Sequence, residues 1–359
     1  MPRRICRRSG ATTRRSTLTT SPPNRYSRQT RFAPIGPDGQ ARLAEAHVMI
    51  VGVGALGTHA ADALARAGVG HLTLVDRDVV EVSNLQRQCL FDEEDARRAR
   101  PKAIAAATAL RRVNESIRVD ADSEELSVER FDALADRPDL ILDGTDNFAA
   151  RMLINDLAIR DGVTWIYAAA VGSTGRAMTI VPGRTPCLRC LMPTPPPTAE
   201  VGTCESMGVL STAITSVVSF QVTEALRWLC RGEFTRGVWV CDPWETIAEL
   251  RMRHTAPDPN CDSCGRGELP ALRTRAESAT PLCGRNAVQV MPHATGGVDL
   301  RKLADGLGDW ASSVECSHQL LRFQADDARF TVFRSGRALV FGTDDAGRAR
   351  ILYDRYVGL

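Results

Sequence analysis

The sequence predicts an α/β protein: a Rossmann-like, mixed but mostly parallel sheet followed by a small C-terminal α+β domain. Two observations lead to this fold class. Between residues 47 and 181, short apolar segments rich in β-branched residues alternate with longer segments rich in Ala and Leu. Such alternation favours a parallel sheet with helices on both faces. A glycine-rich turn also follows the first apolar segment and opens a helix, as in doubly wound sheets.

The first domain is expected to alternate strands and helices. Short β-branched runs indicate buried strands, and longer Ala- and Leu-rich runs indicate helices. The expected strands are His47–Gly52, His71–Asp76, Ile117–Ala121, Asp139–Asp143, Thr164–Ala169 and Gly175–Val181. The expected helices are Ala55–Ala67, Pro101–Val113, Leu126–Ala135, Phe148–Arg160 and Ser211–Leu229. Two late strands, expected to be antiparallel, follow at Val238–Cys241 and Thr246–Leu250.

Changes in composition predict the boundaries between the parts of the chain. We expect a basic tail at residues 1–24, a first domain at 25–268, a linker at 269–280 and a small α+β domain of unknown role at 281–359. The last part has a pattern of its own: a strand at Ala287–Met291, a helix at Leu300–Leu307, three strands and a short terminal helix. We recognise no nucleotide ligand in it.

Charge and hydropathy exclude two broad classes of function. The formal net charge is only +2, from 45 basic and 43 acidic residues, which argues against a nucleic-acid partner bound through bulk charge. No apolar run approaches the roughly 20 residues of a membrane helix. Residues 1–24 contain six arginines and no acidic residue. A targeting peptide can have this composition, and a disordered tail or an upstream start codon is the favoured interpretation.

The glycine motif and the acidic residue after it predict a nucleotide site. Gly52, Gly54 and Gly57 lie between a predicted strand and a predicted helix, where glycine lets backbone N–H groups approach phosphate. Asp76 ends the next strand, where a carboxylate can bind ribose hydroxyls. The motif does not choose the nucleotide. A nicotinamide-dependent oxidoreductase is one alternative, although we find no residue set for hydride transfer.

Polar residues further along favour a triphosphate. Ser83–Gln88 follows the second strand and contains Arg87, and Lys102 begins the next helix, so cations are available for β- and γ-phosphates. Asp146 and Asn147 follow a strand at the edge where α/β sheets place ligands. Asp146 is expected to hold Mg²⁺. The alternative is that this pair caps the following helix, and one residue can cap while the other binds metal.

The order of these motifs resembles the ThiF/MoeB/HesA family, which is related to the ubiquitin-activating enzymes. The resemblance covers about residues 25–268, beginning with Arg25–Gln29. It implies an enzyme that uses ATP to adenylate the C-terminal glycine carboxylate of a small ubiquitin-like sulfur-carrier protein ending in Gly-Gly. The carrier would serve thiamine or molybdopterin synthesis, and the second domain tilts the expectation towards thiamine. A scaffold that binds nucleotide and carrier without catalysis is a further alternative.

The same resemblance implies roles for single residues. Asp76 would bind ribose, Asn84, Arg87 and Lys102 would contact phosphates, and Asp146 would handle Mg²⁺, with Arg87 and Asp146 counted as catalytic. It also implies a homodimer in which Arg28 reaches the ATP site of the partner. Ala55 stands where a glycine is common in the family, which is tolerated if its φ is negative.

Four of the eleven cysteines have the spacing of a structural zinc site. Cys187 and Cys190 form one Cys-x-x-Cys pair, and Cys261 and Cys264 form another. Four thiolates at about 2.3 Å make a closed tetrahedral zinc site. Two redox pairs are the alternative, although neither opens a helix in thioredoxin style. Such pairs usually hold metal in a reducing compartment, so we expect a cytoplasmic protein.

Cys204 is the candidate nucleophile for sulfur transfer. It follows the proline-rich stretch Pro193–Thr198, and a mobile loop beside a nucleotide site suits a nucleophile. Many family members have a sulfur-transfer or thioester cysteine at this place. Others adenylate without one, so an inert cysteine is the alternative. A sulfurtransferase is expected as a further partner.

Overall fold

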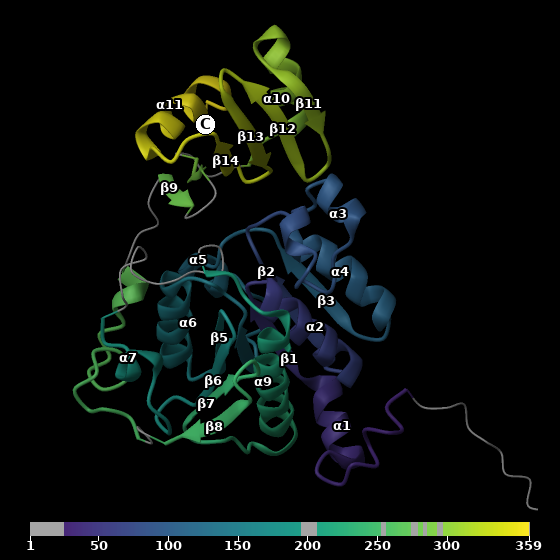
Figure 1. The fold of residues 1–359 in the computed structure, drawn as a ribbon, viewed down its shortest axis with the longest axis vertical. Helices are drawn as coiled ribbons and strands as arrows, with labels where there is room; N and C mark the ends of the chain where they lie inside the picture. Colours follow the sequence, from purple (N-terminus) through teal and green to yellow (C-terminus); the bar gives the residue numbers. More distant parts are fainter. Residues whose placement is uncertain are drawn as a thin grey trace, which may run out of the picture.

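The computed structural model describes residues 25–194, 207–252, 256–273, 279–282, 286–292 and 297–358. They form an eight-stranded sheet and a separate six-stranded sheet, each packed with helices (Figure 1). The fold class expected from the sequence is confirmed: the first sheet is mixed and mostly parallel, and the second is a smaller antiparallel sheet with two α-helices.

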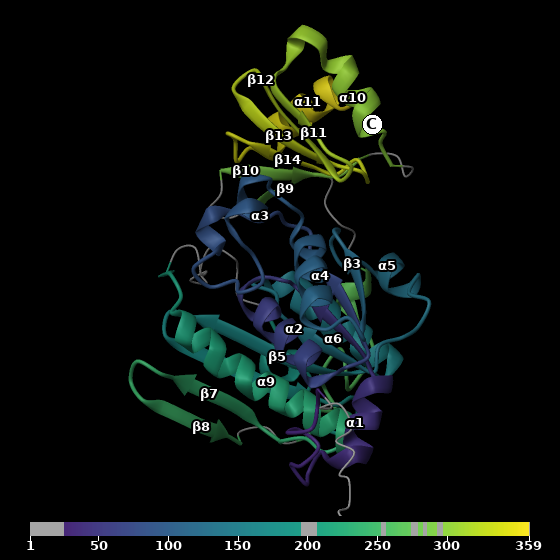
Figure 2. The ribbon, with the colours of Figure 1, turned by 90° about the vertical axis from the view of Figure 1, so that its right-hand side faces the viewer.

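The first sheet has the strand order β3-β2-β1-β4-β5-β6-β7-β8. The first five strands of this order are parallel, and β6, β7 and β8 continue antiparallel. Figure 2 shows the β7–β8 hairpin at the end of the first domain away from the second sheet. The strands are β1 (His47–Val51), β2 (His71–Val75), β3 (Arg118–Asp122), β4 (Leu140–Asp143), β5 (Thr164–Val171), β6 (Thr174–Ile180), β7 (Val238–Asp242) and β8 (Ile247–Arg251).

Both faces of the central strands of this sheet are buried, whereas β8 is exposed along its whole length. Along β1, Val48 and Ile50 point to one apolar cluster, whereas Met49 and Val51 point to another, as the two-residue period of a strand requires. The first cluster includes residues of α1 (Gly36–Glu45), α2 (Ala55–Ala67), α4 (Lys102–Val113) and α9 (Ser211–Arg231). The second includes residues of α5 (Val128–Asp132), α6 (Phe148–Asp161) and α7 (Leu188–Leu191).

Strand register brings several loops to one edge of the sheet. Val51 pairs with Val75 on one side and with Asp143 on the other. The residues that follow these three positions therefore leave the sheet at the same level. The crevice between β1 and β4 is also where the strand order reverses, which is the usual ligand-binding position of such sheets.

The second sheet has the order β11-β12-β13-β14-β10-β9. An apolar cluster joins residues of this sheet to α10 and α11. The strands are β9 (Ala279–Leu282), β10 (Ala287–Val290), β11 (Ser312–Cys316), β12 (Leu320–Ala325), β13 (Ala328–Phe333) and β14 (Ala338–Phe341). The helices are α10 (Leu300–Leu307) and α11 (Ala346–Tyr356), with a 3₁₀ turn, η3 (Gly308–Trp310), after α10.

Some elements differ from the sequence-based expectation. Four strands follow α10 instead of three, and β9 lies where part of the linker was expected. The four residues of β9 include a proline and give no strand signal of their own, so their antiparallel pairing with β10 decides their conformation. Six elements of the described residues were also not predicted: helices α1, α3 (Glu93–Arg97) and α7, and the 3₁₀ turns η1 (Val82–Asn84), η2 (Pro270–Arg273) and η3. Among the described residues, no helix combines the length and apolar character of a membrane span.

Candidate functional site

The glycine loop after β1 packs closely against the loop after β4. Gly52 has φ +84°, and a Cβ there would lie 2.6 Å from the carbonyl carbon of Gly144. A Cβ on Gly57 would overlap the Gly52 carbonyl oxygen. Both positions therefore require glycine, one for backbone conformation and one for close approach. Ala55 is the first residue of α2 and is not among the residues with positive φ, so alanine fits there.

The Asp76 carboxylate is hydrogen-bonded to the glycine loop. Its Oδ2 accepts a hydrogen bond from Val53 N at 2.6 Å, and its Oδ1 accepts one from Asp78 N at 2.7 Å. Burial raises the pKa of this carboxyl, and the nearby Lys102 ammonium opposes the rise. The carboxylate of Asp76 thus lies beside the glycine loop, at the position expected for a ribose ligand.

Lys102 begins α4 and is almost completely buried. Its Nζ lies 3.2 Å from Asp78 Oδ2, and its backbone N–H donates to the Asp78 carbonyl at 2.9 Å. The segment after β2 therefore positions both Asp76 and the start of α4. The residue predicted to bind ribose, Asp76, and the residue predicted to bind phosphate, Lys102, are held by the same segment.

The segment Ser83–Gln88 forms a 3₁₀ turn, η1 (Val82–Asn84), and the residues after it. Asn84 is buried, and its Oδ1 accepts a hydrogen bond from Glu81 N at 3.1 Å. Arg87 is partly buried and donates to the Ser83 carbonyl at 2.8 Å. Gln88 was not assigned a role from the sequence. Its buried Oε1 has no hydrogen-bond partner among the described residues, and its Nε2 lies 3.7 Å from where a Cβ on Gly54 would be.

Asn147 and Asp146 occupy different positions at the start of α6. Asn147 is the N-cap residue, and its Oδ1 accepts a hydrogen bond from Ala150 N at 2.8 Å. Asp146 lies exposed in the bend before it. A carboxylate oxygen suits Mg²⁺, which prefers hard oxygen ligands together with substrate phosphates. The role of Asp146 as a magnesium ligand therefore stays a prediction.

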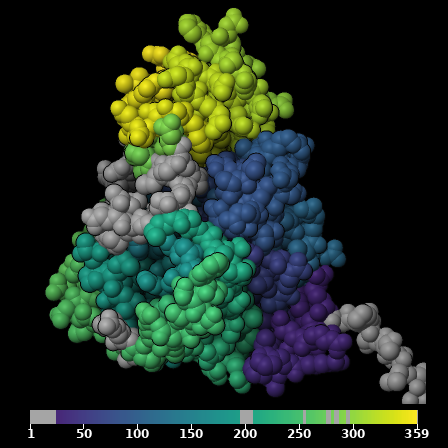
Figure 3. Space-filling model, in the orientation of Figure 1, coloured from purple at the N-terminus to yellow at the C-terminus, as the bar shows by residue number. Residues whose placement is uncertain are grey.

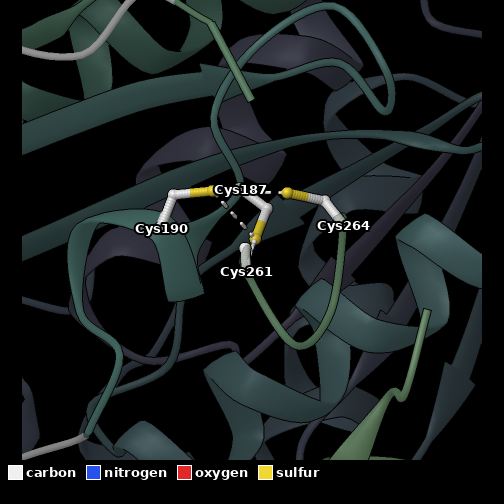
Figure 4. A group of neighbouring side chains, drawn as sticks. All are labelled: Cys187, Cys190, Cys261 and Cys264. Atoms are coloured by element: carbon white, nitrogen blue, oxygen red, sulfur yellow. Dashed lines mark hydrogen bonds between the residues drawn. The ribbon is translucent and has the colours of Figure 1, made fainter. Parts of the chain in front are cut away.

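The four cysteines of the paired motifs lie together (Figure 4). All four Sγ atoms are within 4.8 Å of one another. The separations are 3.6 Å for Cys187–Cys261, 3.3 Å for Cys190–Cys264 and 3.8 Å for Cys187–Cys190. Sulfurs bound at ~2.3 Å to a tetrahedral zinc ion lie about 3.8 Å apart. The donor set and its spacing therefore fit zinc, and the thiols are free of disulfides.

The profile of the ThiF family matches residues 26–263, which contain the glycine loop, the loops after β2 and β4 and three of the four cysteines. The chain belongs to the ThiF family. This confirms the resemblance drawn from the motifs.

Similarity to characterised relatives extends beyond this region. The chain is 40% identical over 339 residues to the sulfur carrier protein ThiS adenylyltransferase of Bacillus subtilis, covering 93% of this chain and 99% of the relative. It is 36% identical to the SAMP-activating enzyme E1 of Haloferax volcanii, covering 69% of this chain and 91% of the relative. The sulfur carrier protein adenylyltransferase of Thermus thermophilus is also 36% identical, covering 67% of this chain and 90% of the relative.

Solved structures share the fold at low identity. The crystal structure of Escherichia coli MccB with ATP superposes with a TM-score of 0.58 at 21% identity, covering 67% of this chain and 75% of MccB. At this identity the similarity concerns the fold alone.

Arg151 is a buried residue of this ThiF-family site that sequence reasoning missed. Its Nε donates to Asp143 Oδ2 at 3.0 Å, and its Nη2 donates to the Thr145 carbonyl at 2.6 Å and the Ala168 carbonyl at 3.2 Å. Burial raises the pKa of Asp143, and the Arg151 charge opposes the rise. The guanidinium thus holds the turn that presents Asp146. A cation near the start of an apolar helical stretch was the available signal.

Polar residues of α6 also support the cysteine cluster. Asp156 is fully buried: its Oδ1 accepts from Ser263 Oγ at 2.6 Å, and its Oδ2 accepts from Ala271 N at 2.9 Å. Asn155 Oδ1 accepts from Leu188 N at 2.8 Å. Helix α6 begins at the loop after β4 and also holds both cysteine loops. The candidate nucleotide site and the cysteine cluster are therefore linked by one helix.

The structure brings together the residues predicted from the loops after β1, β2 and β4 and the start of α4. Two predicted residues stand apart from this group. Arg28 lies exposed in the turn region before α1, and its reach into a partner stays a prediction. Cys204 lies outside the described residues.

Proposed function

We propose that this chain is an ATP-dependent adenylyltransferase that activates the C-terminal glycine carboxylate of a small ubiquitin-like sulfur-carrier protein. The observation that carries the proposal is the 40% identity to a sulfur carrier protein ThiS adenylyltransferase over 93% of the chain. The site supports it, because the glycine loop, an anchored carboxylate and a buried lysine converge at the ligand-binding edge of the sheet.

The reaction is a displacement at phosphorus. A carboxylate oxygen of the carrier attacks the α-phosphorus of ATP, the bond from that phosphorus to the β-phosphate oxygen breaks, and pyrophosphate leaves. The product is an acyl-adenylate. A carboxylate is already ionised at pH 7, so the enzyme needs no base for this step. Positioning and charge stabilisation therefore account for most of the catalysis.

Each proposed ligand has a task in that displacement. Asp76 holds the ribose, while Asn84, Arg87 and Lys102 contact the phosphates and stabilise the negative charge of the leaving pyrophosphate. The glycine loop offers backbone N–H groups to the phosphates. A magnesium ion bound with Asp146 and phosphate oxygens would neutralise charge on the triphosphate. These assignments follow the family motif and are supported by the common location of the loops.

We further propose that the carrier is a ThiS homologue, the thiamine alternative of the two pathways. The alignment with the Bacillus protein spans 339 residues and so includes much of the second domain, whereas the alignments with the Haloferax and Thermus proteins span 251 and 249 residues. The proposal also includes a homodimer and a sulfurtransferase that supplies the sulfur. It places the protein in the cytoplasm, a reducing compartment.

Carrier-dependent ATP–pyrophosphate exchange tests the activity. The purified protein with MgATP and a recombinant ThiS homologue ending in Gly-Gly is expected to exchange labelled pyrophosphate into ATP. The matched control is the same carrier without its last glycine, which presents no correctly placed carboxylate. An exchange rate that is the same with the intact and the truncated carrier would contradict carrier activation. Tight NADH binding without any exchange would favour an oxidoreductase.

Cys204→Ser is expected to spare adenylate formation and to block passage of sulfur to the carrier. Displacing pyrophosphate needs phosphate contacts and Mg²⁺, whereas the sulfur step needs a nucleophile, and a thiolate is the strong one at neutral pH. Thiocarboxylate on the carrier is measured by mass spectrometry beside pyrophosphate exchange. Cys316→Ser, at an exposed cysteine of the second sheet, is the control. Wild-type thiocarboxylate yield in Cys204→Ser would leave the enzyme a pure adenylyltransferase.

A further inference from the structure

The four residues that follow β2, residues 76–79, lie between the candidate site and the second domain. Asp76 and Asp78 face the site, where their carboxylates meet the glycine loop and Lys102. The two residues in alternation with them, Arg77 and Val79, make contacts with the second domain. The Arg77 carbonyl accepts a hydrogen bond from the second domain, and Val79 packs against apolar side chains of that domain. One short segment therefore belongs to both surfaces.

Arg337, in the turn between β13 and β14, makes the polar contact. It is fully buried. Its Nη2 donates to the Arg77 carbonyl at 2.6 Å and to the Ser123 carbonyl at 3.1 Å, and its Nε lies 3.2 Å from Glu124 Oε2. All three partners belong to the first domain and lie at one edge of its sheet, because β2 and β3 pair with Val75 opposite Asp122.

Contacts around Arg337 make the junction a packed interface. On its own domain, Arg337 lies over the Phe333 ring, 3.7 Å from its centroid, and donates to Gln289 Oε1 at 3.4 Å. Gln289 Nε2 in turn donates to Glu125 Oε2 at 3.1 Å. An apolar cluster beside it consists of Val79 and, from the second domain, Leu320, Phe333 and Leu339, with Ala99 and Phe341 packed against it. Figure 3 shows the second domain seated directly on the blue part of the first.

A buried guanidinium is stable only while its donors are paired, since an unpaired buried charge is costly. The pairing partners of Arg337 include two backbone carbonyls, whose positions fix the local path of the chain. One of these carbonyls belongs to the residue between Asp76 and Asp78. Docking of the second domain therefore restricts the two carboxylates and, through the Asp78 contacts, the start of α4 with Lys102.

We propose that Arg337 is a positioning residue for nucleotide binding: by holding the Arg77 carbonyl, the second domain fixes Asp76, Asp78 and Lys102 in the arrangement that binds ATP. This inference rests on the nucleotide roles given under the proposed function. It gives the second domain a role in nucleotide binding, although we recognise no nucleotide ligand among its residues. Because coupling between two sites is reciprocal, bound ATP stabilises the docked second domain.

The test compares full-length wild type with Arg337→Met, and uses Arg334→Met as the matched control. Arg334 lies on the same turn and is exposed, and its guanidinium hydrogen-bonds to His318 of its own domain. MgATP affinity is measured by calorimetry, and KM and kcat by carrier-dependent exchange. We expect Arg337→Met to raise Kd and KM for ATP about tenfold, within the usual range of coupling between sites. The KM for the carrier and kcat at saturating ATP stay near wild type, and Arg337→Lys regains part of the affinity.

Several outcomes separate this inference from the proposed function. Folded Arg337→Met with wild-type ATP affinity would overturn the inference alone, as would an equal loss for ATP and carrier. If Arg337→Met does not fold, Glu124→Gln is used instead, because it removes only the charge of a partner of Arg337. It is expected to raise the Kd for ATP by a smaller factor. An unchanged Kd in this variant would overturn the inference. Wild-type protein that does not bind MgATP would refute the proposed function and this inference with it.

Discussion

Replacement of Lys102 by alanine is expected to abolish carrier-dependent pyrophosphate exchange, and so are Arg87→Ala and Asp146→Ala. Each change removes a charge proposed to act on the triphosphate or its magnesium. Loss of one preorganised contact of this kind typically costs about 3–4 kcal/mol, or roughly 10²–10³ in rate. Exchange is measured at saturating carrier, with circular dichroism and thermal unfolding to check that each variant is folded.

The chain provides a matched control for Lys102. Lys102 and Lys302 are the two lysines among its 45 basic residues, and Lys302 lies exposed on α10 of the second domain. Lys302→Ala is expected to leave exchange unchanged. Lys102 is also paired with Asp78, so Lys102→Ala leaves that carboxylate without its cation, and part of the loss arises from the distorted segment. Near-normal exchange in all three site variants would refute the assigned chemistry.

Cys264→Ser is expected to release the bound zinc and to lower thermal stability sharply. Wild-type protein should contain one zinc ion per chain, held by the four clustered thiols. Structural zinc contributes about 10 kcal/mol or more to the folding of small zinc domains. Even a few kcal/mol lost here would lower the melting temperature by several degrees, at roughly 2 °C per kcal/mol for a domain of this size. Zinc is measured by elemental analysis, and stability by thermal unfolding with and without chelator.

The control for the zinc prediction is Cys230→Ser. Cys230 is a buried cysteine on α9 that is not part of the cluster, so its replacement should leave the zinc content at the wild-type value. Equal zinc content in Cys264→Ser and wild type would contradict the assignment. Disulfides within both pairs of a carefully reduced preparation would favour the redox alternative.

The sequence by itself determined the elements and motifs whose signals are local. The glycine loop is defined within six residues, and its helix, Ala55–Ala67, has the same bounds in the structure as in the prediction. Hydrophobic periodicity and turn residues are properties of short windows, so they can be read without knowing what lies opposite. The spacing of each cysteine pair is local in the same sense, and it predicted the cluster although 74 positions separate Cys187 from Cys261.

Only the tertiary structure decided the residues that act through distant partners. Arg151 is one of two arginines on α6, and only the fold places it beside Asp143. The strand β9 forms because β10 is there to pair with it. Arg337 and Arg77 are 260 positions apart, and no local window contains both. A buried cation is stabilised by whichever carbonyls and carboxylates the packing brings to it, so its partners are set by domain docking and not by neighbouring sequence.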